Sequence, residues 1–129
     1  MFFALRGAIF GTSFNRTKNK DMIAYLTLEI RIEGAQSLKD RRQVVRSVKD
    51  GLRTRFNVAV AEIDPSDAWQ RATLGVVSIS SSRDYLDGLM RNVERFAVRA
   101  ANNSGGEVTD SFLDFLNEAE FGDRLTGEP

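Results

Sequence analysis

Residues 23–33 alternate between apolar and polar side chains, and this period of two constrains the fold more than any other feature of the chain. Such alternation is typical of a β-strand with one face buried and one exposed. The rest of the chain must then supply a layer that covers the apolar face. The apolar set is Ala24, Leu26, Leu28, Ile30 and Ile32, and the opposite set is Tyr25, Thr27, Glu29, Arg31 and Glu33.

A helix is expected directly after this strand, over residues 38–56. Gly34 interrupts the alternation, and Ser37 begins a Ser-Leu-Lys-Asp signal in which the hydroxyl caps the helix and Asp40 lies in the first turn. Apolar residues then recur at helical spacing, as expected of an amphipathic helix. They are Leu38, Val45, Val48, Leu52 and Phe56.

Two further strands, a second helix and a final strand complete the pattern. Residues 58–64 and 69–80 are expected to pair as a hairpin, because a Pro-Ser-Asp turn signal separates them. Ser82 is the expected cap of the second helix. Residues 107–116 are expected to form the fourth strand, although their apolar and polar residues alternate poorly. The order β-α-β-β-α-β predicts an α+β fold of the ferredoxin-like type, a four-stranded antiparallel sheet with two helices on one face.

The predicted domain spans residues 22–116, between two segments of different character. Residues 117–129 are expected to be an acidic, flexible tail. Residues 1–21 are expected to be a disordered extension, or to reflect a start assigned too early with Met22 as the true start. Their apolar run comes before the basic residues, unlike a secretory signal, and is too short to span a membrane. A cleaved or membrane-associating segment is the alternative.

The composition excludes several kinds of site. The 129 residues include neither Cys nor His, which excludes disulfides, thiolate or imidazole metal ligands, a Cys nucleophile and an imidazole base. No phosphate-binding or zinc-protease motif is present. Glu62, Asp64 and Asp67 are the remaining candidates for a cation site or a general base, but turn chemistry explains the two aspartates equally well. We expect a cytoplasmic globular protein with no cofactor, no metal and no catalytic residue.

Charge is strongly segregated although the chain is formally neutral, with 18 basic and 18 acidic residues. Residues 38–56 carry seven basic and two acidic side chains, and residues 107–129 carry one basic and seven acidic side chains. Five cations of the first helix recur every three or four residues and fall within about one quarter of its circumference. This column can follow RNA phosphates; a solvated helix face and a docking site for an acidic protein are the alternatives. The column consists of Lys39, Arg42, Arg46, Lys49 and Arg53.

Other arginines have different expected roles. Arg41 lies toward the apolar sector of the first helix, so we expect it to pair with a carboxylate across the sheet. A second column on the second helix, formed by Arg91, Arg95 and Arg99, is expected to be a salt-bridged surface, because Asp87 precedes Arg91 by four residues.

Aromatic residues give a weak signal for base stacking. Trp69, the single tryptophan, can stack on a base or close the end of the core. Gln70 and Arg71 can then form hydrogen bonds with the turn around Asp64 and Asp67. On the uncovered sheet face only Tyr25 is an aromatic residue of the central strands that could stack on a base, so this face is expected to be a dimer surface or simply hydrated.

Three stretches of the chain are distinctive: residues 37–47 (SLKDRRQVVRS), 56–62 (FNVAVAE) and 67–76 (DAWQRATLGV). Together they resemble the YlxP-like family of small bacterial cytoplasmic proteins. The resemblance implies a ferredoxin-like fold. Family members are often encoded beside translation initiation factor 2 and ribosome-binding factor A, which implies a role near translation. The resemblance implies no catalytic residue, and it marks as family-motif residues Arg41, Asp67, Trp69, Gln70 and Arg71.

These observations favour a non-enzymatic accessory protein that binds the ribosome or ribosomal RNA through the cation column of the first helix. The alternative is an oligomeric module, such as a homodimer, that binds a protein or a small ligand through the uncovered sheet face. No membrane partner is expected.

Overall fold

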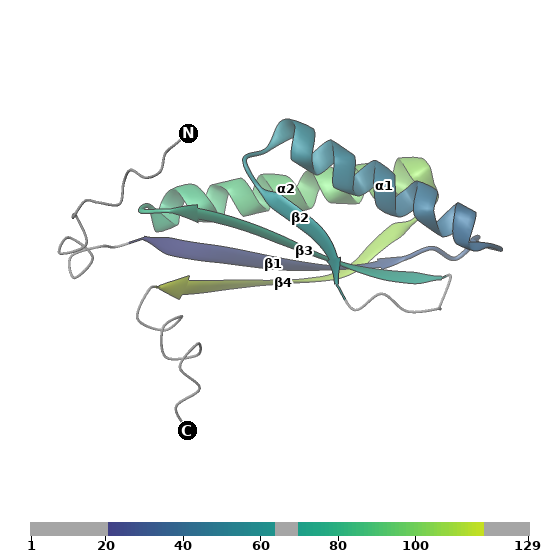
Figure 1. Ribbon diagram of the computed structural model, residues 1–129, viewed down its shortest axis with the longest axis horizontal. Coiled ribbons are helices and arrows are strands. Elements are labelled where there is room, and N and C mark those ends of the chain that lie inside the picture. Colours follow the sequence, from purple (N-terminus) through teal and green to yellow (C-terminus); the bar gives the residue numbers. More distant parts are fainter. Residues whose placement is uncertain (1–20, 64–69, 118–129) are drawn as a thin grey trace, which may run out of the picture.

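The computed structural model describes residues 21–63 and 70–117, which form one sheet covered on one face by two helices (Figure 1). All neighbouring strands are antiparallel, in the order β2-β3-β1-β4. The predicted ferredoxin-like β-α-β-β-α-β fold is therefore confirmed. In chain order the elements are β1 (Met22–Arg31), α1 (Leu38–Arg55), β2 (Ala59–Ile63), β3 (Arg71–Ser80), α2 (Arg83–Ser104) and β4 (Glu107–Asn117).

A β-bulge explains why the last strand alternates poorly in the sequence. Glu29 of β1 pairs with Asp110, whereas the next residue, Ile30, pairs with Val108. Thr109 is thus an extra residue in β4, and its hydroxyl donates to the carbonyl of Glu29 at 3.3 Å. One extra residue reverses the facing of every side chain beyond it. Inward-facing and outward-facing residues of β4 therefore alternate regularly before and after Thr109, but the alternation shifts by one residue at Thr109.

The core lies between the sheet and the helices, and β1 contributes most directly to it. All five residues of the predicted apolar set, Ala24 to Ile32, are buried. They meet the apolar stripes of the helices, except that Leu38, expected in the stripe of α1, is 43% exposed at the first helical position. The buried apolar helical residues are Val44, Val45, Val48 and Leu52 of α1, and Leu86, Met90, Val93, Ala97 and Ala101 of α2.

Both predicted helix caps are present. The Ser37 hydroxyl accepts a hydrogen bond from the backbone N–H of Asp40 at 3.2 Å, and the Ser82 hydroxyl accepts one from the N–H of Tyr85 at 3.1 Å. At the other end of α2, Gly105 has a φ of 103°, the left-handed conformation that commonly ends a helix. These caps fix the starts of both helices and the end of α2, and Ser37 fixes the start of the cation column on α1.

Two glycines of the α2 region should respond oppositely to alanine. Gly105→Ala should lower the free energy of unfolding by about 1 kcal/mol, because alanine is strained at positive φ. Gly88→Ala should raise it by up to about 1 kcal/mol, because Gly88 is an exposed position inside α2 where an added methyl meets nothing. Urea denaturation of both variants measures the two changes. A loss of stability in Gly88→Ala would contradict the assigned helix.

Candidate nucleic-acid interface

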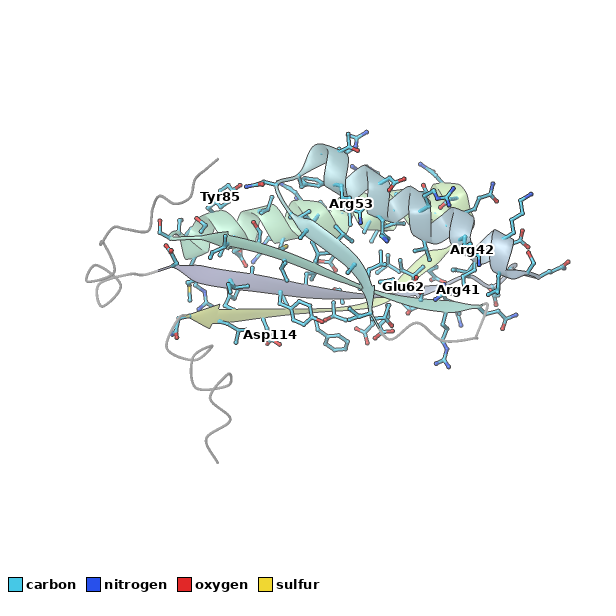
Figure 2. The ribbon with its side chains drawn as sticks, in the orientation of Figure 1. Arg41, Arg42, Arg53, Glu62, Tyr85 and Asp114 are labelled. Carbon is cyan, nitrogen blue, oxygen red and sulfur yellow. The ribbon has the colours of Figure 1, made fainter. Side chains whose placement is uncertain are left out.

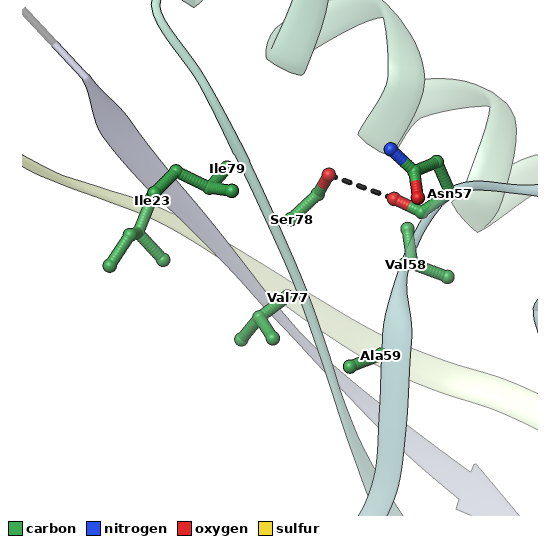
Figure 3. A pocket seen from close by; sticks show the side chains of 7 residues that line it. All are labelled: Ile23, Asn57, Val58, Ala59, Val77, Ser78 and Ile79. Atoms are coloured by element: carbon green, nitrogen blue, oxygen red, sulfur yellow. Dashed lines mark hydrogen bonds between the residues drawn. The ribbon is translucent and has the colours of Figure 1, made fainter. Parts of the chain in front are cut away.

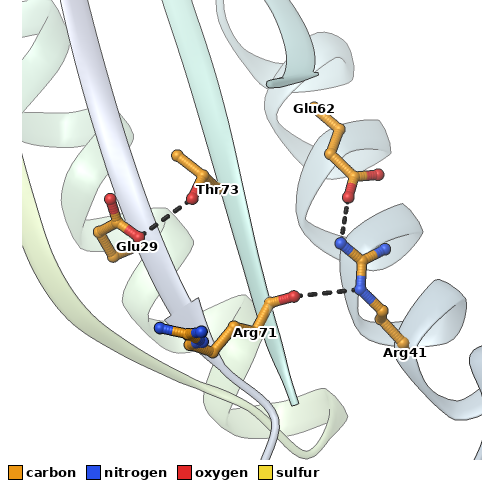
Figure 4. A network of polar contacts seen from close by, with 5 residues as sticks. All are labelled: Glu29, Arg41, Glu62, Arg71 and Thr73. Atoms are coloured by element: carbon orange, nitrogen blue, oxygen red, sulfur yellow. Dashed lines mark hydrogen bonds and ion pairs between the residues drawn. The ribbon is translucent and has the colours of Figure 1, made fainter. Parts of the chain in front are cut away.

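Arg41 of α1 connects three secondary-structure elements, and we call this set of contacts the Arg41 clasp (Figure 4). Its guanidinium donates through Nη2 to the carboxylate of Glu62 on β2, and through Nε to the backbone carbonyl of Arg71 on β3 at 3.1 Å. The Arg41 side chain is 8% exposed and the Glu62 side chain is 21% exposed. The expected carboxylate partner is therefore confirmed, and it is Glu62.

The clasp positions α1 beside the outer edge of the sheet. β2 is an edge strand, and both Arg41 and Arg53 reach from α1 to it, the latter by donating to the carbonyl of Val60 at 3.4 Å. The exposed side of α1 thus runs along β2. Figure 2 shows Arg42 and Arg53 on α1, near the strand that carries Glu62, with Asp114 at the opposite edge of the sheet.

A groove of about 320 Å³ lies between the exposed side of α1 and β2. Four of the five predicted cations line it, and Lys39, one turn nearer the start of α1, does not. Arg42, Arg46 and Arg53 are exposed, and Lys49 is half-buried. We call this feature the basic groove, and its lining residues are Arg41, Arg42, Val45, Arg46, Lys49, Asp50, Arg53 and Glu62.

The two carboxylates of the basic groove neutralise little of its exposed charge. Glu62 is already held by Arg41. Asp50 lies 3.8 Å from Arg53, with both side chains more than half exposed, so this pair is weak. Within residues 21–63 and 70–117, none of the ion pairs involves Lys39, Arg42, Arg46 or Lys49. Their positive charge is therefore directed to solvent.

The second cation column, on α2, is more strongly compensated. Arg91 donates to Asp87 at 2.8 Å, which confirms the expected salt bridge, and Arg95 donates to the side-chain oxygen of Asn92 at 2.9 Å. Arg99 lines a separate hollow with Arg55 and Phe96. The Arg55 guanidinium lies 4.7 Å from the centre of the Phe96 ring. The α2 column is thus engaged locally in a way that the α1 column is not.

Two family-motif residues besides Arg41 lie within the described residues, Gln70 and Arg71, and the backbone carbonyl of each accepts a hydrogen bond. The Arg71 carbonyl belongs to the Arg41 clasp, and the Gln70 carbonyl accepts a hydrogen bond from the N–H of Ile32 at 2.8 Å. The motif stretches 37–47 and 67–76 therefore meet in space through the buried Arg41 guanidinium and the Arg71 carbonyl. Asp67 and Trp69, together with the turn they belong to and Asp64, lie outside the described residues.

The uncovered sheet face carries the residues expected from β1 and several apolar ones that the sequence pattern missed. Tyr25, Thr27, Glu29 and Arg31 occupy it as predicted, because their alternate neighbours are buried against the helices. Phe112, which pairs with Thr27, lies on the same face and is 55% exposed. Its position follows from the bulge at Thr109, which no local sequence signal reveals. We call this surface the open face.

Two further observations concern membranes and metals. Among the described residues, no helix has both the length and the apolar character needed to cross a bilayer. In the same residues, no three acidic side chains gather where they could hold a metal ion.

The fold and its motifs define a small α+β domain of the YlxP-like type. Residues 23–111 match the family described as Protein of unknown function (DUF503), and the chain belongs to this family. A curated relative, the uncharacterized protein YlxP of Bacillus subtilis (strain 168), is 35% identical over 75 residues, which cover 58% of this chain and 82% of the relative.

The similar solved structures share with this chain only the arrangement of helices and strands. The designed protein Foldit4 has a TM-score of 0.47 at 9% identity and is matched over 96% of its length and 74% of this chain. A C-terminal segment of the alpha subunit of aIF2 from Pyrococcus abyssi has a TM-score of 0.44 at 11% identity; the match covers 76% of this chain and 51% of that one. Likeness at this level carries no functional argument.

Removal of Arg41 should destabilise the fold far more than removal of its neighbour. Arg41→Met should lower the free energy of unfolding by about 3 kcal/mol, because it leaves the Glu62 carboxylate largely buried without a partner. Arg42→Met, an exposed control, should change it by less than about 0.5 kcal/mol. The double variant Arg41→Met/Glu62→Leu should recover most of the loss.

Urea denaturation of the four proteins measures these differences. Equal stabilities of Arg41→Met and Arg42→Met would contradict the clasp.

Proposed function

We propose that this protein is a ribosome- or RNA-associated accessory factor that binds nucleic-acid phosphates through the basic groove and the adjoining Lys39. The observation that carries the proposal is a column of five cations on α1, four of which line the groove. Among the described residues Arg53 has only the weak, exposed pair with Asp50, and no ion pair engages the other four, Lys39, Arg42, Arg46 and Lys49. Unpaired cations held in a row favour a polyanion, because each phosphate contact releases condensed counterions.

The geometry of the column suits an extended phosphate backbone. Lys39 and Arg53 are fourteen residues apart on one helix, which separates them by about 21 Å along its axis. Three of the five cations are arginines, whose planar guanidinium groups bind phosphate oxygens in a bidentate manner. A helix holds these groups at fixed spacing, so a bound strand would meet an ordered series of donors.

The Arg41 clasp favours this use of the groove. A free Glu62 carboxylate at the base of the groove would repel phosphates. Arg41 neutralises it at short range and keeps it on the protein side of the groove. The field experienced by a ligand is then set by Arg42, Arg46 and Lys49, with Arg53 shared with Asp50.

We also propose that the protein acts by binding and not by catalysis. Of the three acidic residues considered as a general base, Glu62 is the one that lies within the described residues. Its carboxylate accepts a hydrogen bond from the Arg41 guanidinium. The same contact that shapes the groove therefore argues against a catalytic use of this residue.

Charge reversal on α1 should abolish RNA binding. In Arg42→Glu/Arg46→Glu/Arg53→Glu, three phosphate contacts become repulsive, so affinity for a labelled single-stranded RNA should fall by at least about 100-fold. Fluorescence anisotropy at low salt measures this, and co-sedimentation with bacterial ribosomal subunits extends it to the proposed partner. The matched control, Arg91→Glu/Arg95→Glu/Arg99→Glu, changes the net charge equally on α2.

The control variant should lose much less affinity than the α1 variant. Equal losses in the two variants would show a response to net charge alone and would contradict a defined site. Unchanged binding by the α1 variant would exclude the groove. Circular dichroism of both variants verifies that the helices remain folded.

A further inference from the structure

The open face exposes large apolar side chains on neighbouring strands. Ile79 and Val77 of β3 are 60% and 37% exposed, and Phe112 of β4 is 55% exposed. Ile79 pairs directly with Ile23 of β1, and Val77 with Tyr25, so the apolar residues form a continuous area across the sheet. Exposed apolar areas of this kind are characteristic of interaction surfaces.

The centre of the open face is flattened by an aromatic ring lying over a glycine. A Cβ atom added to Gly75 would lie 3.1 Å from the Tyr25 ring and 3.4 Å from a methyl group of Ile63. The Tyr25 ring therefore occupies the space that a side chain at position 75 would need. The result is a broad surface without a central ridge, suited to a flat partner.

The two edges of the open face differ in relief. On β4 the outward residues include the large Phe112 and Leu116. On β2 the small Ala61 lies in the row of Phe112 and the small Ala59 in the next row, and the larger Ile63 lies in the row of Asp110 at the far end of the strand. A hollow of about 510 Å³ lies beside Ala59, lined on the open face by Ile23, Val77 and Ile79 (Figure 3). One edge is thus raised and the opposite edge is recessed.

We propose that the open face binds a second copy of this chain, with a two-fold axis parallel to the strands. Such an axis places β4 of each copy over β2 of the other, so large side chains meet small ones on both sides of the axis. A self-associating surface must be complementary to itself. The raised β4 edge of one copy fits the recessed β2 edge of the other, so the open face is complementary to itself. A different partner would need a raised and a recessed edge of its own at matching positions.

The size of the open face is sufficient for a dimer. At about 4.8 Å between strands and 3.3 Å per residue, strands of ten, five, ten and eleven residues cover about 570 Å². Two copies would together bury more than about 1,100 Å², above the roughly 1,000 Å² expected of a specific interface.

The charges of the open face also favour a protein partner over a nucleic acid. The face carries the acidic Glu29, Asp110 and Asp114 along with the basic Arg31 and Arg71. These acidic groups would repel phosphates, so the open face is expected to bind a different kind of ligand from the basic groove. In the proposed dimer Asp114 lies on the β4 edge, at the rim of the interface, where it remains hydrated.

An apolar-to-acidic change on the open face should convert the dimer to a monomer. By sedimentation velocity from 1 to 200 µM, the full chain should be dimeric at the upper concentrations, and Ile79→Asp/Phe112→Asp should be monomeric throughout. Val98→Asp is the matched control, because Val98 is an exposed apolar residue on α2 and should leave the dimer intact. A full chain that stays monomeric, or a dimer that persists in the double variant, would overturn the proposal.

Single cysteines test the orientation independently, because the chain contains none of its own. Asp114 and Ala59 lie in the same row of the sheet at opposite edges, joined through Tyr25 and Val77. Facing sheets lie about 10 Å apart, which is further than a disulfide spans. A mixture of Ala59→Cys and Asp114→Cys chains should therefore be joined into a dimer by a short bismaleimide cross-linker, and neither variant should be joined alone. A cross-link between two Asp114→Cys chains, or no cross-link in the mixture, would overturn the proposed orientation of the two copies.

Discussion

The contact between Arg41 and Glu62 determines how the first helix lies on the sheet. A guanidinium with 8% of its surface exposed is stable only when its donors have partners, and those partners come from two different strands. The contact therefore fixes α1 relative to β2 and β3 together. The cations on the exposed side of α1 take their position along the edge strand from this arrangement, and so the basic groove depends on a buried arginine in its own lining.

The two surfaces proposed for binding are separated by the sheet and differ in chemistry. The basic groove is lined by α1 and β2 and is dominated by cations without carboxylate partners among the described residues. The open face combines apolar side chains with charges of both signs. A dimer formed through the open face would leave both grooves outside the interface. Two grooves on one particle would raise the affinity for a long RNA by local concentration, without any new contact.

Much of the fold could be predicted because its signals are local. The alternation in β1, the serine caps of both helices and the order of elements each depend on residues close together in the sequence. The cation column was likewise predictable from helical spacing alone. The partner of Arg41 could be expected only as some carboxylate, because the identity of Glu62 depends on how β2 lies against α1.

The exposed Phe112 could not be predicted, because the bulge at Thr109 reverses the facing of the residues after it. A bulge changes the register by one residue and is determined by pairing with β1, which a period-two analysis of β4 alone does not include.

Amide chemical-shift mapping by NMR during titration with a short single-stranded RNA at low salt tests the central claim most directly. The claim is that phosphates are bound in the groove between α1 and β2. We expect the largest shift changes at residues 39–53 and at Val60 to Glu62. Changes centred on Tyr25, Val77 and Phe112, with residues 39–53 unaffected, would place the RNA on the open face and contradict the account.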